Sequence, residues 1–142
     1  MTGDLAVLDE DVPFVDGPIL RPEQTDLYFQ PERSVESATL FEHCARAIDV
    51  SLAVGAHGLP LIGSGDWNDG MNRVGHEGRG ESVWLGWFLH GVMAAFVPIA
   101  EARGDRRRAE RWRAHMKSLR RALERDGWDG DWYRRAFFDD GT

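Results

Sequence analysis

The spacing of apolar and polar residues predicts a loop-rich lead-in followed by three helices. Residues 1–33 contain four prolines and no sustained apolar period, so we expect an extended acidic lead-in there. A first helix is expected from Ser34, a suitable N-cap, to about Val54. Its apolar side chains form one stripe: Phe41, Cys44, Ile48 and Leu52. Gly55 and Gly58 then act as stop signals.

The second and third predicted helices differ in their apolar pattern. A helix that begins at Glu81 or Ser82 and runs to about Ala102 has no polar face, which predicts burial nearly all round. Pro98 should kink it or end its regular part. A helix over about 106–125 is amphipathic, with its apolar seam at Ala109, Trp112, Met116, Leu119 and Leu123. After Gly127 we expect a turn and a short strand or an irregular loop. The pattern predicts an all-α fold of about three helices with long loops, over residues 34–142.

Composition and charge narrow the classes of function. The chain has 142 residues and a net charge of −7, which argues against nucleic-acid binding. The stretch from Asp105 to Asp126 contains nine basic and four acidic residues. It is either a solvated face or a docking face. A single cysteine, Cys44, and an acidic N-terminus predict a cytoplasmic chain without an internal disulfide. The apolar run from Val83 to Ala100 is interpreted as a buried helix rather than a membrane span.

Residues Gly58 to Ser82 carry the candidate chemistry. Asp66 and Asp69 bracket Trp67 and Asn68, and glycines surround all four residues. One interpretation is a turn in which the acidic and amide side chains cap backbone amides. The other is a sugar site, in which the indole stacks on C–H groups and one carboxyl protonates a glycosidic oxygen. The residues alone leave both interpretations open.

Other chemistries fit this stretch less well. The glycine comes too early after Asp66 for an EF-hand calcium loop, no Cys or His pair has zinc spacing, and we expect no metal site. His57 and His76 flank the acidic motif in loops, whereas His90 is expected to be a core histidine. Arg73 and Arg79 are candidates for binding an anion, or are solvated. The tail offers a second candidate for sugar or phosphate contact, or for packing: Trp128, Trp132, Arg134 and Arg135.

The stretch GLPLIGSGDWNDGMNRVGHEGRGESVWLGWFL closely resembles the inverting phosphorylase domain of cyclic β-1,2-glucan synthases. That domain belongs with cellobiose and chitobiose phosphorylases in glycoside hydrolase family 94. The preceding FEHCARAIDVSLAVGAHGLPLIGSGDWNDG and the tail WDGDWYRRAFFDDG are similar to the same domain, so the resemblance covers nearly the whole chain.

The resemblance implies part of an (α/α)6 barrel with its active site in loops at one end. It implies that Asp69 is the general acid, that Trp67 contacts the sugar at the cleaved bond, and that Asp66 supports the substrate or the loop. Asn68, Arg79 and Arg134 are further expected substrate contacts. Inorganic phosphate is expected as the nucleophile and co-substrate, with no other cofactor, and a β-linked glucan as the substrate.

Size is where the chain departs from this family, because a barrel has twelve helices and the pattern here predicts three. We therefore expect a fragment of a longer, inner-membrane-associated protein, whose remainder completes the site. Two alternatives stay open: a carbohydrate-binding fragment without turnover, and an (α/α)6 hydrolase that uses water.

Overall fold

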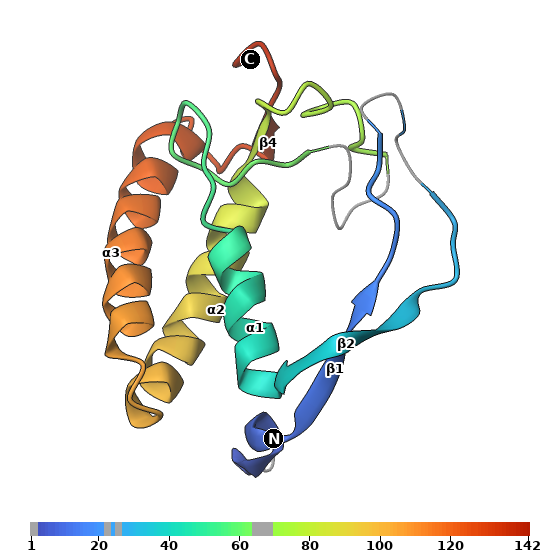
Figure 1. The fold of residues 1–142 in the computed structure, drawn as a ribbon. Helices are drawn as coiled ribbons and strands as arrows, with labels where there is room; N and C mark the ends of the chain where they lie inside the picture. Colours follow the sequence, from blue (N-terminus) through green and yellow to red (C-terminus); the bar gives the residue numbers. More distant parts are fainter. Residues whose placement is uncertain (1–2, 22–23, 25–26, 64–69) are drawn as a thin grey trace. The chain divides into compact units, whose positions relative to one another are not determined.

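The computed structural model describes residues 3–21, 24, 27–63 and 70–142, and all structural statements below refer to them. The chain forms two compact units, Met1–Asp49 and Val50–Thr142, and each is described by itself. Figure 1 shows the course of the chain and the labels of its elements.

The first unit consists of a hairpin-like sheet and a helix. A 3-10 turn, η1 (Ala6–Asp9), precedes strand β1 (Asp11–Asp16), which pairs antiparallel with β2 (Glu32–Thr39). Helix α1 (Leu40–Val50) follows at once and buries three side chains: Phe41, Ala45 and Ile48.

The predicted start of the first helix at Ser34 is wrong. Ser34 lies inside β2, and Thr39 lies at the true helix start, where its Oγ1 accepts a hydrogen bond from the backbone N–H of Glu42 at 3.3 Å. Val35 and Thr39 in this stretch are β-branched, which also suits a strand. Strand β1 forms within the proline-containing lead-in and pairs with β2. Sequence spacing alone cannot show which segments pair.

The second unit contains the other two helices, close to their predicted bounds. They are α2 (Val83–Ala102) and α3 (Arg106–Ala122), the latter continued by one π-helical turn, η2 (Leu123–Gly127). Ser82 caps α2 by accepting a hydrogen bond from the N–H of Leu85, and Asp105 caps α3 in the same way from Arg108. Helix α2 continues through Pro98 to Ala102, so the prediction that its helical part could end at the proline is wrong.

Helix α2 is buried along one stripe rather than all round, which corrects the sequence prediction. The stripe that packs with α3 comprises Val83, Gly86, Leu89, Met93, Val97 and Ala100. Elsewhere on the helix the Phe88 side chain is 58% exposed, and Ala94, Ala95 and Pro98 are exposed as well. By length and composition alone α2 could also cross a membrane, a property that core helices of soluble proteins share.

A small antiparallel sheet closes the end of the second unit at which α2 begins. Strand β3 (Glu81–Ser82) pairs on one side with β4 (Ala136–Phe137). On its other side, Leu61 forms a bridge to Glu81, and the N–H of Ser82 donates to the carbonyl of Pro60 at 2.8 Å. The short strand expected in the tail is thus confirmed, and so are the three helices. The class is corrected from all-α to mainly helical with two small antiparallel sheets.

Candidate functional site

The acidic motif itself lies outside the described residues. Asp66, Trp67, Asn68 and Asp69 fall in the gap at 64–69, so their predicted roles stay predictions. The structure does describe the residues on both sides of this gap. These residues, 60–63 and 70–82, form what we call the base of the motif loop.

Close backbone packing holds the two sides of the base together. The N–H of Ile62 donates to the carbonyl oxygen of Gly80 at 3.0 Å, and the Ile62 side chain is buried. A Cβ atom on Gly75 would lie 2.3 Å from Cγ2 of Ile62. A Cβ atom on Gly80 would lie 2.4 Å from the carbonyl oxygen of Val74. Both positions therefore need glycine, and these two glycines allow the chain to enter and leave the motif at neighbouring points.

A buried carboxylate, that of Glu81, organises the loop that precedes the base. Glu81 is 1% exposed, and its two oxygens accept hydrogen bonds from the backbone N–H groups of His57 (3.1 and 3.0 Å) and Leu59 (2.9 Å). Its Oε2 also lies 2.5 Å from Nδ1 of His57. Gly55 makes room for this group, because a Cβ there would lie 2.5 Å from the carboxyl carbon. These hydrogen bonds stabilise the buried carboxylate of Glu81, whereas an isolated buried charge would be unfavourable.

A second carboxylate, that of Asp139, ties the base to the tail. Its oxygens accept hydrogen bonds from the backbone N–H groups of Glu77, Arg79 and Gly80 at 2.9–3.0 Å, and Oδ2 lies 3.3 Å from Nδ1 of His76. Burial raises the pKa of Asp139, but the three backbone hydrogen bonds and His76 outweigh it, so the pKa lies below its ordinary value. The segment after the motif is therefore anchored to a residue near the end of the chain.

Sequence reasoning did not identify Glu81 and Asp139 as functional candidates. Glu81 was interpreted only as a possible helix start, and Asp139 only as part of a turn-rich tail. A usable signal exists for Glu81, since an acid directly between a glycine-rich loop and an apolar helix is a candidate buried carboxylate. For Asp139 no local signal exists, because its partners are about 60 residues away in the sequence.

Of the two arginines predicted to bind substrate, Arg79 lies in the base. Its Nε donates to the carbonyl oxygen of Asp139 at 3.1 Å, and its guanidinium pairs with Glu77. The other, Arg134, is exposed, and its guanidinium lies 5.7 Å from the ring centroid of Phe137 in β4. The same ring stacks on the imidazole of His57, with ring centroids 4.0 Å apart. Their roles in substrate binding stay predictions.

The two other histidines of the sequence analysis, His76 and His90, each contact a residue three positions earlier in the chain. Nδ1 of His76 lies 3.0 Å from the carbonyl oxygen of Arg73. His90 packs edge-on against Trp87 in α2, with ring centroids 6.2 Å apart. Within the described ranges, no three His, Cys, Asp or Glu side chains gather as a metal-binding group.

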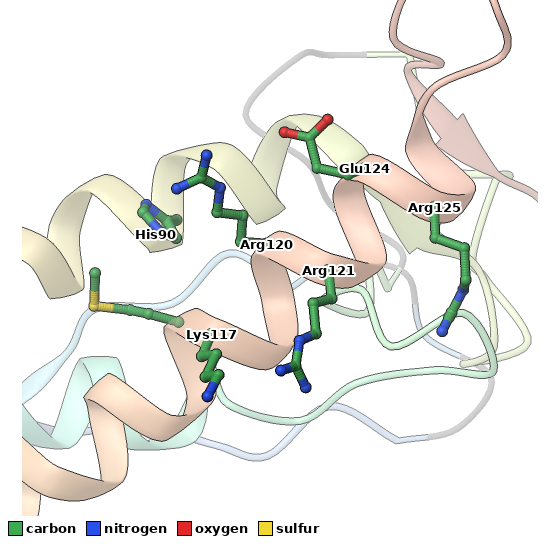
Figure 2. Close-up of a pocket in the computed structure, with 7 residues that line it drawn as sticks. His90, Lys117, Arg120, Arg121, Glu124 and Arg125 are labelled. Carbon is green, nitrogen blue, oxygen red and sulfur yellow. The ribbon is translucent and has the colours of Figure 1, made fainter.

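A basic groove of about 860 Å³ runs along α3. Its lining comprises His90, Met116, Lys117, Arg120, Arg121, Glu124 and Arg125. Arg125 is paired with Asp126, and this pairing keeps the pKa of Asp126 below its ordinary value. Figure 2 shows that the basic side chains fan out from the helix instead of converging on one point. The groove therefore does not favour a single small anion, and the choice between a solvated and a docking face stays open.

The match to known proteins extends over the whole chain. A family model described as the glycosyl hydrolase 94 superfamily, catalytic domain, matches residues 1–142. The chain belongs to this family. It is 52% identical over 143 residues to the cyclic beta-(1,2)-glucan synthase NdvB of Rhizobium meliloti (strain 1021), covering 100% of this chain and 5% of that protein.

The chain is also similar to two phosphorylases of Paenibacillus borealis, so its relatives include phosphorylases as well as a glucan synthase. The chain is 44% identical over 110 residues to 3-O-beta-D-glucopyranosyl-beta-D-glucuronide phosphorylase, covering 77% of this chain and 14% of that protein. It is 33% identical over 142 residues to solabiose phosphorylase, covering 99% of this chain and 16% of that protein. The chain thus spans at most about a sixth of these three relatives.

Proposed function

We propose that this chain is the part of a glycosyl hydrolase 94 catalytic domain that supplies the general acid for inverting phosphorolysis of a β-linked, β-1,2-type glucan. The observation that carries the proposal is the 52% identity to a cyclic beta-(1,2)-glucan synthase over the whole chain. The names of the other relatives, which are phosphorylases, support phosphate as the nucleophile. The helices would then form part of an (α/α)6 barrel.

In the proposed reaction, the carboxyl group of Asp69 donates its proton to the oxygen that bridges two glucosyl units. The bond between this oxygen and the anomeric carbon breaks, and an oxygen of inorganic phosphate forms a new bond to that carbon from the opposite face. The products are glucose 1-phosphate of inverted configuration and a glucan with a free hydroxyl, and Asp69 is left as a carboxylate. The reverse reaction lengthens the glucan.

The neighbouring residues bind and orient the sugar in this proposal. Trp67 stacks on the glucosyl ring at the cleaved bond. Asp66, Asn68, Arg79 and Arg134 bind sugar hydroxyls. Glu81 and Asp139 are positioning residues, because their hydrogen bonds go to the loops around the motif and not to substrate.

Other parts of a longer polypeptide would complete the site, since the relatives extend far beyond the matched segment. We place the phosphate-binding groups there, and the complete protein in the cytoplasm in association with the inner membrane. The 142-residue chain alone would bind glucan without turnover.

The test is an Asp69→Asn substitution in the complete polypeptide that contains this segment, with glucose 1-phosphate release from linear β-1,2-glucan as the readout. Loss of a general acid should lower the rate by about 10²–10⁴-fold while glucan still binds. The matched control is Asp16→Asn, which changes an exposed acid of β1 and should leave the rate unchanged.

Two further arms separate the alternatives. Unchanged release by the Asp69→Asn protein would refute the assignment of the general acid. Cleavage that proceeds equally without phosphate would identify a hydrolase instead. Equal rates on β-1,3- and β-1,4-glucans of the same length would contradict the β-1,2 preference.

A further inference from the structure

The tail of the chain forms a small hairpin that carries three aromatic side chains. Trp128 and Tyr133 face each other in an antiparallel bridge, and the N–H of Arg134 donates to the carbonyl oxygen of Gly127 at 2.8 Å. Oδ1 of Asp129 accepts hydrogen bonds from the N–H groups of Asp131 (3.0 Å) and Trp132 (2.9 Å). These bonds lower the pKa of Asp129. These hydrogen bonds give the hairpin a defined backbone structure.

The aromatic rings of this hairpin are exposed, although Trp128 and Tyr133 contact each other. Trp132 is 70% exposed, Trp128 42% and Tyr133 41%. Three contacts hold the Tyr133 side chain. Its ring meets those of Trp128 and Trp87 edge-on, with centroids 5.1 and 5.4 Å apart, and its hydroxyl donates a hydrogen bond to Glu124 at 3.0 Å. Large rings fixed in an exposed position lose little conformational entropy when a ligand stacks on them.

The hairpin is continuous with the base of the motif loop. Strand β4, which pairs with β3, begins three residues after Tyr133, and the carbonyl oxygen of Arg135 accepts a hydrogen bond from the N–H of Val83 at 3.2 Å. Figure 1 shows the tail and the loop that follows the motif at the same end of α2. The hairpin and the base therefore belong to the same unit and are joined through the pairing of β3 with β4.

We propose that the hairpin Trp128–Tyr133 is a second glucan-binding surface, which takes glucosyl units of a long substrate away from the cleaved bond. The proposal rests on the proposed function, because it takes the substrate class from there. The apolar C–H faces of glucosyl rings stack on exposed indoles, and hydroxyls bind to nearby charged groups. Asp131, which precedes Trp132 in the chain, is exposed and provides such a group.

A glucan fits this surface better than a protein partner does. Interface cores between proteins are depleted of charged residues, whereas the segment Asp-Gly-Asp-Trp at the tip places two acids next to the most exposed ring. The exposed rings of the hairpin therefore differ in surroundings from Phe88 in α2, whose ring stacks on Trp84 of the same helix with centroids 5.4 Å apart.

The test measures glucan binding to the complete polypeptide with Asp69→Asn, so that no substrate is consumed. Trp132→Ala should weaken binding of a long linear β-1,2-glucan by about tenfold, or about 1.4 kcal/mol, and leave binding of the β-1,2-linked disaccharide unchanged. Trp132→Tyr, which retains a ring, should restore most of the affinity. The control Phe88→Ala removes another exposed ring of the unit, 58% exposed against 70% for Trp132, and should have no effect.

Unchanged affinity of the Trp132→Ala protein for the long glucan would overturn the proposal. Equal weakening for the disaccharide and the long glucan would also overturn it, because the ring would then act at the cleaved bond or through the fold. The binding measurement does not depend on phosphorolysis. Selective loss of long-glucan binding would therefore support the hairpin even if Asp69 proved not to be the general acid.

Discussion

The Oε2 atom of Glu81 lies 2.5 Å from the Nδ1 atom of His57, and the Glu81 side chain is shielded from water. The same imidazole stacks on Phe137 at 4.0 Å. Two residues thus join three stretches of chain: the loop before the base, strand β3 and strand β4.

Replacing Glu81 by Gln should destabilise the second unit. The amide keeps one acceptor oxygen but presents N–H groups to the backbone donors of the 55–59 loop, so buried donors lose their partners. We expect the free energy of unfolding to fall by about 1–3 kcal/mol in urea titrations. The control is Glu77→Gln, which removes an exposed pair with Arg79 and should change stability by about 0.5 kcal/mol or less. Equal effects of the two substitutions would contradict the role given to Glu81.

Replacing Gly80 by Ala should open the base of the motif loop. The new Cβ would lie 2.4 Å from the carbonyl oxygen of Val74, a backbone atom that cannot rotate away. We expect a loss of about 2 kcal/mol or more and faster amide hydrogen exchange at Ile62. The matched substitution Gly91→Ala, in the interior of α2 with no atom within 4 Å, should instead add about 0.5–1 kcal/mol. An unchanged exchange rate at Ile62 would show that the base tolerates the methyl group.

Replacing Asp139 by Asn should flatten the dependence of stability on acid pH. The folded-state pKa of Asp139 is lowered, so its contribution is present above the unfolded-state value near 3.8 and is lost as the pH falls through the folded-state value. Thermal midpoints measured between pH 6 and pH 3 should fall less steeply in the Asn variant. A slope equal to that of the unsubstituted chain would contradict the hydrogen bonds assigned to this carboxylate.

His115 should make stability fall on mild acidification. Burial lowers its pKa from 6.5, and its buried Nε2 has no hydrogen-bond partner among the described residues. His115 lines a cavity of about 410 Å³ together with Arg121 and Arg125. The stability associated with neutral His115 is present above pH 6.5 and is lost as the pH falls towards the folded-state pKa. His115→Gln should remove this loss between pH 7 and pH 5 in unfolding titrations, and an unchanged loss would refute it.

The two long helices could be predicted because their signals are local. The Ser82 and Asp105 caps and the apolar periods of α2 and α3 lie within a few residues of the elements they define. Strand β2 was mistaken for helix because Ser34 suits both structures and its pairing partner, β1, is separated from it by a long loop. The exposed part of α2 was missed because periodicity shows which residues are apolar but not what covers them.

The residues of the candidate site also differ in whether local sequence can identify them. Asp66, Trp67, Asn68 and Asp69 are recognisable as a contiguous motif, so sequence reasoning could assign them roles. Glu81 and Asp139 act through partners 22 to 62 residues away, and only the folded chain brings these together. Arg79 was proposed as a substrate contact, and the structure additionally gives it a partner in Asp139.

The pairing of β3 with β4 has a consequence for the order in which this region can form during synthesis. The ribosome makes the motif and the base before it makes Ala136, Phe137 and Asp139. Until those residues emerge, the growing chain contains every residue of the motif but lacks one edge of its supporting sheet and the carboxylate that anchors residues 77–80. The base therefore gains its full set of hydrogen bonds only after residues 136–139 have been translated, and a nascent chain that stalls before Ala136 would carry the motif without this complete support.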